Sequence, residues 1–467
     1  MNRRELLKNG GLCAAALIAN GCKTLPPLSR GKKASPAPAA VRKPPARRLN
    51  VAVIGAGGQG LEVLKSVAEA GDRVAALCDV DRNQLESSTA MLGRRYQQRD
   101  IAVFKDFRVL LEQQTTAGKR LDAVFVATPD HGHAMQVREA LRYRVPVFVE
   151  APAVRTLGEL RLLQNSAKEC KTPLWQGICN RTETAFRQAV AAIEGGIIGT
   201  VNRVYVWTSA PLWPQGMAVP TDGEPPPPEL DWELWQLPHT GRRYREGAYL
   251  PAVWRGWCDF GTGSLGSEGP ALMNLPFQAL ELQPPVKIEC LGERSPHPES
   301  YPAASRLRFT FKGQKKSKAS DELTMEWSDA GVRPDIMETL GQGLNRIPAE
   351  GCLLAGTRGF WLMADRTGRR HYFASAGNGF VPLDQAPAVA DFMPKNVAMP
   401  LRQTFLEMIR RGKNAKMSTN LGSSLLETVL TGCVAMRTGA DALEWNSGRT
   451  RFLRNPEANA LVGNLPG

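Results

Sequence analysis

A glycine-rich loop between an apolar strand and an amphipathic helix constrains the fold of this chain more than any other feature. The apolar run Leu49–Ile54 leads directly into the loop Gly55–Gly60, whose sequence is GAGGQG, and a helical pattern over Gly58–Ala70 follows. Glycines at the first, third and sixth positions permit a tight turn and let backbone N–H groups approach a pyrophosphate at a helix N-terminus. The loop therefore predicts the first βα unit of a dinucleotide-binding Rossmann domain.

Strand-like and helix-like segments continue to alternate after this loop. Thr156–Glu159 has the sequence of a capping box and begins a predicted helix that runs to about Lys171. Further strands are predicted at Val74–Cys78, Ala123–Ala127, Val145–Val149 and Pro173–Cys179. Parallel strands joined by helices form a doubly wound α/β sheet, with its ligand crevice at the carboxyl ends of the strands. We therefore predict an NAD(P)-binding Rossmann domain over residues 49–180.

The pattern changes after Arg181, and a second, α+β domain is predicted over residues 181–467. Its predicted elements are a helix at Phe186–Glu194, β-rich segments at Val201–Thr208 and Ser305–Lys312, and helical stretches at Leu401–Arg411 and Leu421–Thr438. The segment Pro211–Gly263 is rich in proline, tryptophan and glycine, and is too irregular for a regular element. Long ordered loops of this kind usually cover a binding cleft.

The first 22 residues are typical of an export signal. Asn2–Lys8 resembles a twin-arginine signal, and the apolar stretch Leu12–Ala19 is too short to span a bilayer. It ends at a sequence that resembles a lipoprotein cleavage site with Cys22 as the lipidated residue; an ordinary secretory segment cut nearby is the alternative. Residues 23–48 hold six prolines and eight basic residues but no acid, which is typical of a solvated linker. We predict a bacterial protein that is periplasmic or lipid-anchored at the cell envelope.

Much of the net charge of +14 belongs to this N-terminal region. Residues 1–48 hold eleven lysines and arginines against one acid, Glu5. The rest of the chain has no strong basic excess, so we predict no nucleic-acid partner and no membrane contact except a lipid at Cys22. The nine cysteines are scattered and include no C-x-x-C pair, so neither a zinc site nor a disulfide framework is indicated.

An acidic residue at the end of the second predicted strand supports a nucleotide site. Asp79 is placed to accept hydrogen bonds from an adenosine ribose. Together with Asp81 it favours NAD over NADP, because a carboxylate repels a 2′-phosphate, while the neighbouring Arg82 leaves NADP open. The predicted cofactor-binding residues are Gly55, Gly57, Gly58, Gln59, Gly60, Asp79, Thr128, Pro129, His131, His133 and Glu150.

Two histidines stand at the predicted mouth of the crevice. Thr128–His133 follows the strand Ala123–Ala127 directly. One interpretation is a turn and a helix cap with both histidines in solvent. A histidine pair next to an aspartate also resembles a metal site, but we predict no metal here.

Together these motifs resemble the Gfo/Idh/MocA family of glucose-fructose oxidoreductase and inositol dehydrogenase relatives, in its signal-bearing, exported branch. The resemblance extends over residues 49–462. Its most specific parts are the Gly55 loop, Cys78–Asp81, Ala127–His131, Trp254–Trp257, Asp259–Gly263 and Glu457–Leu461. The resemblance implies a nicotinamide cofactor and a sugar- or polyol-like substrate. It also implies a C-terminal domain built on a large open, mainly antiparallel sheet that is often used for contacts in a homo-oligomer.

The chain departs from this family where its members carry their chemistry. Members typically have Glu-Lys-Pro after the fifth strand, whereas this chain has Ala151 in place of the lysine. Members also have Gly-Asp-x-Gly-x-His shortly after a Phe-Gly-Thr-Gly run, which is Phe260–Gly263 in this chain. The histidine of this motif is the general base. This chain has Ser267 at the aspartate position and Ala271 at the histidine position, and the aspartate that often follows is Asn274. A general base typically contributes ~10²–10⁴-fold to the rate. The replacements at Ala151, Ser267 and Ala271 together indicate that this chain does not carry out ordinary dehydrogenase chemistry.

Few other residues can replace the missing groups. Glu268 is one position from the missing aspartate and is a candidate base if the loop register shifts; in normal register it is expected to point away. The residues predicted to line the substrate cleft are Arg181, Tyr249, Trp254 and Arg255, although each can equally be structural in a packed loop. Tryptophan faces in this region suit sugar rings or simple packing between elements.

Three functional hypotheses remain. The first is an exported NAD(P)-dependent oxidoreductase that acts on a carbohydrate or polyol with an unusual base. The second is a catalytically silent relative that binds nucleotide or sugar. The third uses bound NAD transiently to cleave a glycosidic bond, but it needs the same acid/base groups. The site chemistry favours a silent or divergent protein, while the resemblance favours an oxidoreductase.

Overall fold

The computed structural model describes residues 47–116, 120–313, 318–334, 336, 344, 346–412 and 422–463. The predicted export signal, Cys22 and nearly all of the predicted linker lie outside these residues.

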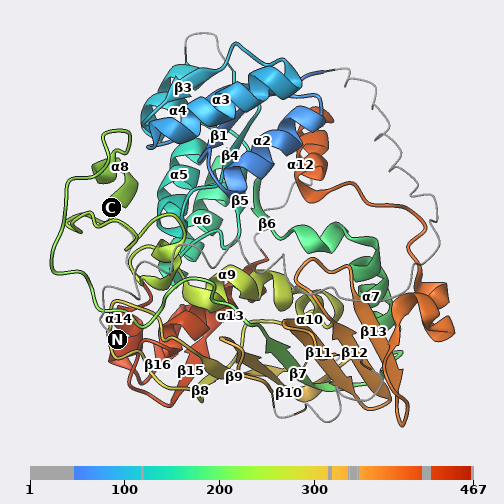
Figure 1. The fold of residues 1–467 in the computed structure, drawn as a ribbon. Helices are drawn as coiled ribbons and strands as arrows, with labels where there is room; N and C mark the ends of the chain where they lie inside the picture. The colour runs from blue at the N-terminus through green and yellow to red at the C-terminus, as the bar shows by residue number, and fades with distance from the viewer. Residues whose placement is uncertain are drawn as a thin grey trace, which may run out of the picture. The chain divides into compact units, whose positions relative to one another are not determined.

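The first part of the structure is a parallel sheet of six strands. Its order is β3-β2-β1-β4-β5-β6, which reverses direction between β1 and β4 (Figure 1). The strands are β1 Asn50–Ile54, β2 Arg73–Cys78, β3 Ala102–Phe104, β4 Ala123–Val126, β5 Val147–Glu150 and β6 Leu174–Gly177. The helices between them are α2 Gln59–Glu69, α3 Arg82–Tyr96, α4 Phe107–Thr115, α5 Asp130–Arg142 and α6 Leu157–Cys170. This is the predicted Rossmann sheet, and a ligand crevice opens where such a strand order reverses.

Local sequence signals explain these elements. The central strands β4 and β5 are apolar at almost every position and buried on both faces, as parallel strands covered by helices must be. Thr156 and Glu159 form the predicted capping box at the start of α6. The short strand β3 was not predicted, because it has only three residues and its central Val103 is exposed.

The second part is a sheet of ten strands. Its order is β14-β13-β12-β11-β7-β10-β9-β8-β15-β16, and only β7 and β10 pair in parallel. The strands are β7 Val201–Trp207, β8 Lys287–Cys290, β9 Arg306–Lys312, β10 Ala319–Ser328, β11 Gly351–Gly356, β12 Gly359–Met363, β13 His371–Ser375, β14 Val381–Pro382, β15 Ala442–Asn446 and β16 Arg451–Leu453. A mainly antiparallel sheet was expected, and it is confirmed.

Helices lie between the two sheets and join them into one unit. They are α7 Thr184–Glu194, α9 Gly263–Leu272, α10 Asn274–Ala279 and α13 Ser423–Ala435 (Figure 1). The shorter helices are η1 Cys179–Thr182, α8 Trp232–Gln236, η2 Val253–Gly256, η3 Leu383–Gln385, η4 Pro387–Phe392, η6 Ser447–Arg449 and α14 Pro456–Ala460. None of the helices in the described part of the chain has the length and apolarity to cross a membrane.

A late helix returns to the first sheet. Helix α12, Leu401–Arg410, lies beside α2 although it follows the strands β7 to β14 in the chain (Figure 1). Its apolar face buries Leu401, Phe405 and Leu406 in the same core as the residues of β1 and α2. The Rossmann part is therefore completed by a segment from far along the chain.

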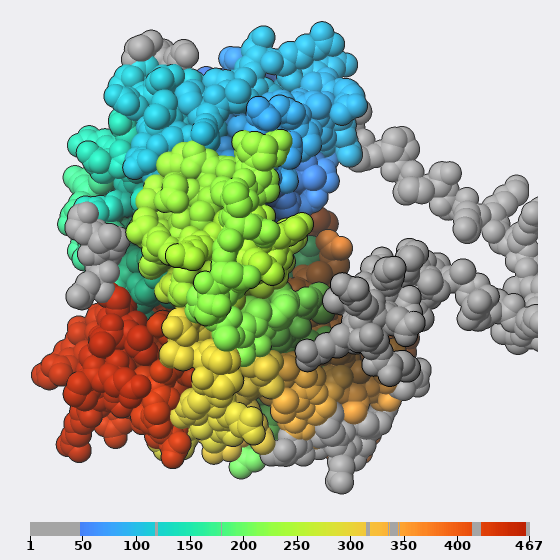
Figure 2. Space-filling model, turned by 60° about the vertical axis from the view of Figure 1, so that its left-hand side comes forward, coloured from blue at the N-terminus to red at the C-terminus, as the bar shows by residue number. Residues whose placement is uncertain are grey.

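The segment Pro211–Gly263 covers the front of the Rossmann part, as the yellow-green surface in Figure 2 shows. It contains α8 and η2, so the prediction that it holds no regular element was wrong. Its aromatic side chains pack on one another and hold it in place; the buried ones are Trp232, Trp235, Tyr249, Trp254, Trp257 and Phe260. Backbone bonds from Asp231 to Val80 and from Arg82 to Glu229 attach it to the end of β2.

Candidate functional site

One cavity of about 1120 Å³ lies at the carboxyl ends of the Rossmann strands. It extends from the glycine loop and Asp79, past the start of α5, to helix α9 and the loop that joins β12 to β13. Its volume is larger than the ~300–1,000 Å³ of most small-molecule pockets. The position agrees with the crevice predicted for a doubly wound sheet.

The glycine loop has the geometry of a phosphate cradle. Gly55 has φ +94°, and a Cβ at this position would lie 2.7 Å from the backbone of Ala127. A Cβ at Gly60 would collide with the carbonyl oxygen of Gly55, so the turn requires glycine at both places. No side chain caps the N-terminus of α2, and the space beside Gly58 is open. Uncapped N–H groups facing an open space fit a pyrophosphate.

Asp79 ties the end of β2 to this loop. One of its carboxylate oxygens accepts a hydrogen bond from Ala56 N–H at 2.7 Å, and the other accepts one from Asp81 N–H at 3.0 Å. Burial raises the pKa of Asp79, and these bonds oppose the rise. Because each carboxylate oxygen has a second lone pair, the residue can still accept a bond from a ribose hydroxyl in the cavity that it lines.

The two histidines of the α5 motif are buried, so the interpretation that places them in solvent is wrong. The His131 ring lies 2.7 Å from Trp235 O and 3.2 Å from Phe260 O, and burial lowers its pKa to about 3. The His133 ring nitrogens each lie 2.8 Å from a backbone carbonyl oxygen, of Pro152 and of Thr128. Both rings therefore hold backbone in place at the cavity wall. No group of three metal-ligating residues occurs among the described residues.

Glu150 ends β5 in a buried ion pair. Arg402 of α12 donates from Nε to Glu150 Oε1 at 2.9 Å, and Gln59 reaches the other oxygen at 3.5 Å. Burial raises the pKa of Glu150, and the Arg402 guanidinium opposes this rise. Thr128 is held as well, because its hydroxyl donates to Gln136 Oε1 at 2.7 Å. No motif pointed to Arg402, which lies 252 residues from its partner.

The three positions at which the family resemblance implied lost acid/base groups lie around this cavity. Ala151, Ser267 and Ala271 all line it. Asn274 does not, because its amide donates at 2.8 Å to Asn180 Oδ1, and Asn180 in turn donates at 2.8 Å to Ala271 O. This buried amide chain fixes the end of α9 beside Ala271.

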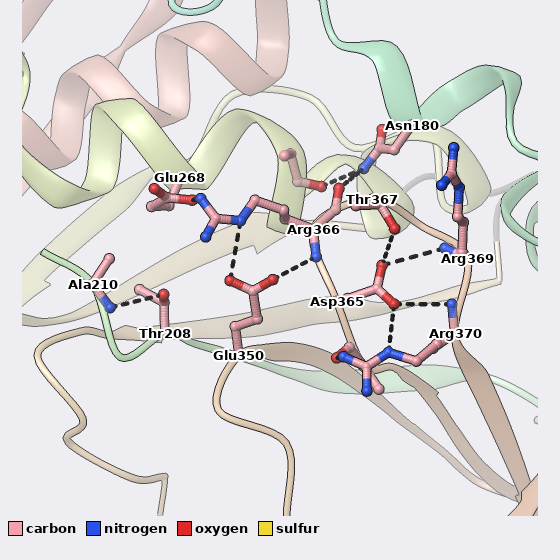
Figure 3. Close-up of polar contacts among 12 residues, drawn as sticks. Asn180, Thr208, Ala210, Glu268, Glu350, Asp365, Arg366, Thr367, Arg369 and Arg370 are labelled. Carbon is pink, nitrogen blue, oxygen red and sulfur yellow. Dashed lines mark hydrogen bonds and ion pairs between the residues drawn. The ribbon is translucent and has the colours of Figure 1, made fainter. Parts of the chain in front are cut away.

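Glu268 lines the cavity, contrary to the expectation that it points away in α9. Its carboxylate accepts a bond from Arg366 Nη1, and Arg366 also lies 3.2 Å from Glu350 (Figure 3). Burial raises the pKa of Glu268, and Arg366 opposes this rise. One guanidinium thus serves two glutamates.

The loop between β12 and β13 supplies a cationic wall that the sequence analysis missed. Asp365 folds it by accepting bonds from Thr367 Oγ1 at 2.5 Å and Arg370 Nε at 2.8 Å (Figure 3). Burial raises the pKa of Asp365, but these bonds outweigh it and the pKa is lowered. Arg369 pairs with Glu183 at 3.0 Å. The only sequence signal was a cluster of arginines on a turn.

Asp130 is the carboxyl group nearest the start of α5. It is buried, lines the cavity and accepts a hydrogen bond from the Thr262 hydroxyl at 2.6 Å. Burial raises its pKa; His133, Thr262 and Arg255 oppose the rise. Asp130 lies within the motif Thr128–His133, but the sequence assigned it no catalytic role.

The predicted substrate residues divide into two pairs. Trp254 and Arg255 line the cavity. Tyr249 does not border it, because its side chain is 1 % exposed within the aromatic cluster of the covering segment. Arg181 does not border it either, and its Nε donates to Ile178 O at 3.2 Å.

Comparison with known proteins agrees with the fold. Residues 49–178 match the Gfo/Idh/MocA model, described as an oxidoreductase family with an NAD-binding Rossmann fold. The chain is 30 % identical over 169 residues to a glycosyl hydrolase family 109 protein of Solibacter usitatus, covering 36 % of each chain. It is 27 % identical over 154 residues to inositol 2-dehydrogenase 1 of Saccharopolyspora erythraea, covering 32 % of this chain and 43 % of that one. The alignments span less than half of these two relatives.

Solved structures are similar over a larger part of the chain. An inositol dehydrogenase homolog from Azotobacter vinelandii, complexed with NAD+, has a TM-score of 0.58 at 18 % identity and covers 86 % of this chain and 98 % of that one. The WlbA dehydrogenase from Bordetella pertussis, in complex with NADH and UDP-GlcNAcA, has a TM-score of 0.55 at 15 % identity, with the same coverage. The Rossmann part of this chain, residues 49–178, therefore matches the Gfo/Idh/MocA oxidoreductase family, and the chain shares its two-sheet fold with these solved structures.

Proposed function

We propose that this protein binds NAD and a sugar- or polyol-like molecule in one cavity, and that any redox chemistry there uses a proton acceptor other than the family's residues. The observation that carries the proposal is the continuity of the cavity. It joins the glycine loop and Asp79 to α9 and the β12–β13 loop, so both molecules have room side by side.

The residues present fit a dinucleotide. The uncapped start of α2 and the open space at Gly58 suit the pyrophosphate, and Asp79 suits the adenosine ribose. Arg82 does not line the cavity, and its guanidinium lies 3.7 Å from Glu86 and from Glu229. This arrangement supports NAD rather than NADP, because the Arg82 guanidinium lies beside two carboxylates that do not line the cavity. When bound, NAD supplies a hydride acceptor or donor.

Asp130 is the strongest candidate for proton transfer. Oxidation of an alcohol needs a group that takes the hydroxyl proton, and Ala151, Ser267 and Ala271 offer none with a suitable pKa. Among the described residues, one side-chain hydrogen bond reaches Asp130, from the Thr262 hydroxyl to Oδ2, which leaves Oδ1 for a substrate hydroxyl. Its raised pKa brings it closer to that of a useful acid/base group. We assign it the role of accepting that proton.

A catalytically silent binding protein is the second candidate function. The ion pair between Arg366 and Glu268 favours it. Glu268, the other carboxyl group at this end of the cavity, is neutralised by Arg366 and is a poor base in that state. If Asp130 also takes no proton, the site binds its ligands without turnover. The third hypothesis is transient oxidation coupled to cleavage of a glycosidic bond. It also needs a carboxyl group that accepts the hydroxyl proton.

The cellular setting belongs to the proposal as well. We propose export through the segment of residues 1–22, with lipidation at Cys22 and a homo-oligomeric assembly. The described free cysteines, five of them buried, are consistent with folding before export. Light scattering of the purified protein tests the assembly: a monomer mass at micromolar concentration contradicts it.

The first experiment measures the cofactor. The purified protein is titrated with NADH, and quenching or enhancement of nicotinamide fluorescence gives the affinity. A panel of neutral sugars and polyols is then added with NAD+, and absorbance reports NADH formation. Binding without turnover supports the silent protein, turnover supports the divergent oxidoreductase, and no binding at millimolar NADH contradicts the proposed function.

A further inference from the structure

One cation at the cavity wall differs from the others. The cavity is bordered by Lys105, Arg255, Arg366 and Arg369. Lys105 pairs with Asp231 at 2.9 Å, Arg366 with Glu268, and Arg369 with Glu183. Within the described residues, the Arg255 side chain forms no hydrogen bond or ion pair.

Aromatic rings hold this guanidinium instead. It lies over the ring of Trp254 at 4.2 Å and over the ring of Trp213 at 5.4 Å. Stacking engages the face of the planar group and leaves its in-plane N–H donors open. The donors are therefore preorganised for a planar or tetrahedral oxyanion, which guanidinium binds through two parallel hydrogen bonds.

The electrostatic surroundings place this cation next to the proposed chemistry. Burial lowers the pKa of the Arg255 guanidinium by disfavouring its charge, and the carboxyl groups of Asp130 and Glu268 oppose this effect. A ligand anion at Arg255 would restore the solvation that burial removes. An anionic group bound at Arg255 would also hold the sugar ring that carries it beside Asp130.

We propose that Arg255 is the anchor for an oxyanion, a carboxylate or a phosphate, on the sugar-like ligand of this cavity. The substrate class is thus an anionic sugar or polyol rather than a neutral one. This inference rests on the proposed function, because it concerns the same cavity.

The test compares acidic and neutral ligands of the same skeleton. Protein saturated with NADH is titrated calorimetrically with D-galacturonate, D-glucuronate and D-gluconate, and with the parent sugars galactose and glucose. Glucose 6-phosphate forms a separate arm. We expect an acidic ligand to bind at least about tenfold more tightly than its neutral parent. Tighter binding of the phosphate than of the carboxylates identifies phosphate as the source of the oxyanion.

Variants distinguish an anchor from a packing residue. R255Q is expected to lose about tenfold to a hundredfold in affinity for the acid and little for the neutral parent, since a charge-assisted bond is removed. R255K keeps the charge without the fork and should be intermediate. R245Q is the matched control, because Arg245 is an exposed arginine on the same segment that pairs with Asp222. The melting temperature of each variant reports folding.

Several results overturn the inference. Equal affinities of the wild type for an acidic ligand and its neutral parent would contradict it. An equal loss of affinity for both ligands in R255Q would contradict it as well. Absence of binding by every acidic probe does so as well. The NADH titration of the same sample separates these failures from failure of the proposed function, since NADH binding survives only in the former.

Discussion

The carboxylate of Glu268 and the guanidinium of Arg366 form an ion pair on the wall of the cavity, and the same guanidinium contacts Glu350. The pair joins α9 of the second part to the loop between β12 and β13. Arg366 donates to Glu268 Oε2 and opposes protonation of this carboxylate, so a proton taken from a substrate would have to compete with the guanidinium. The ion pair therefore assigns Glu268 to structure more readily than to proton transfer.

This relationship predicts different results from two isosteric substitutions. If the protein turns over a sugar or polyol, D130N should reduce kcat/KM by about 10²–10⁴-fold, because the proton acceptor is lost. E268Q should reduce kcat/KM much less and mainly lower the melting temperature. Steady-state kinetics and thermal unfolding of both variants measure these effects. Loss of turnover in E268Q with full activity in D130N would reverse the two assignments.

The glycine loop predicts a separation between folding and cofactor binding. G57A should fold, because its new methyl group meets only the flexible end of Gln84, but it should bind NADH at least about tenfold more weakly where backbone must approach the pyrophosphate. G55A should fail at both, because its Cβ would lie 2.7 Å from backbone at a positive φ. Circular dichroism and NADH titration decide. Unchanged NADH affinity in G57A would place the pyrophosphate elsewhere.

The Arg402–Glu150 pair predicts a large stability effect from a distant substitution. R402Q leaves the buried Glu150 carboxylate without its cation, which should cost about 3–5 kcal/mol in the free energy of unfolding. The double variant E150Q/R402Q should recover part of the loss, because no lone charge remains. Urea unfolding measures each value. R411Q is the control: Arg411 is exposed and its removal should cost less than about 1 kcal/mol.

His131 predicts an acid-sensitive contribution to stability. Its pKa is lowered from 6.5 to about 3 in the folded protein, so the unfolded chain binds a proton that the folded protein refuses. The stabilising contribution is complete above pH 6.5 and falls by about 1.4 kcal/mol per unit as the pH drops toward 3. His239 and His371 follow the same sign to about pH 4. The difference in unfolding free energy between wild type and H131N should therefore shrink steadily below pH 6.5; a constant difference would show that His131 does not titrate in this way.

The N-terminal segment predicts processing at a defined cysteine. When the full chain is expressed in a bacterial host with twin-arginine export, the processed protein should appear in the membrane fraction with a diacylated Cys22 as its first residue. C22A should block lipidation, and replacement of Arg3 and Arg4 by lysine should block export. Mass spectrometry of the mature N-terminus and cell fractionation report both. A cytoplasmic, uncleaved wild-type chain contradicts the proposed location.

The parts of the fold that local signals specify were predictable. The strand β1, the glycine turn and the capping box of α6 each depend on residues within a few positions of one another. The strand β3 was missed because it is stabilised by pairing with β2 and not by its own sequence. A large open, mainly antiparallel sheet was expected from the family resemblance alone, because local signals do not specify a strand order that joins segments far apart in the chain.

The candidate site was likewise predictable only where local sequence signals specify it. The sequence placed Asp79, the histidine motif and the three replaced positions near one cavity, because each follows a strand or a recognisable motif. It did not reveal Arg366 or Arg402, whose partners are close only in space. Nor did it distinguish Tyr249, buried in an aromatic cluster, from Trp254, which lines the cavity. Aromatic residues in an irregular segment have the same composition in either role.

The return of α12 to the first sheet also governs the order in which this protein is made. A ribosome that has completed strand β5 must add 252 residues after Glu150 before Arg402 exists to neutralise it. During that interval the nucleotide-binding half has an exposed apolar surface where Phe405 and Leu406 will later lie. Nascent chains of this protein should therefore depend on chaperones until synthesis passes α12, and cofactor loading becomes a late event in biogenesis.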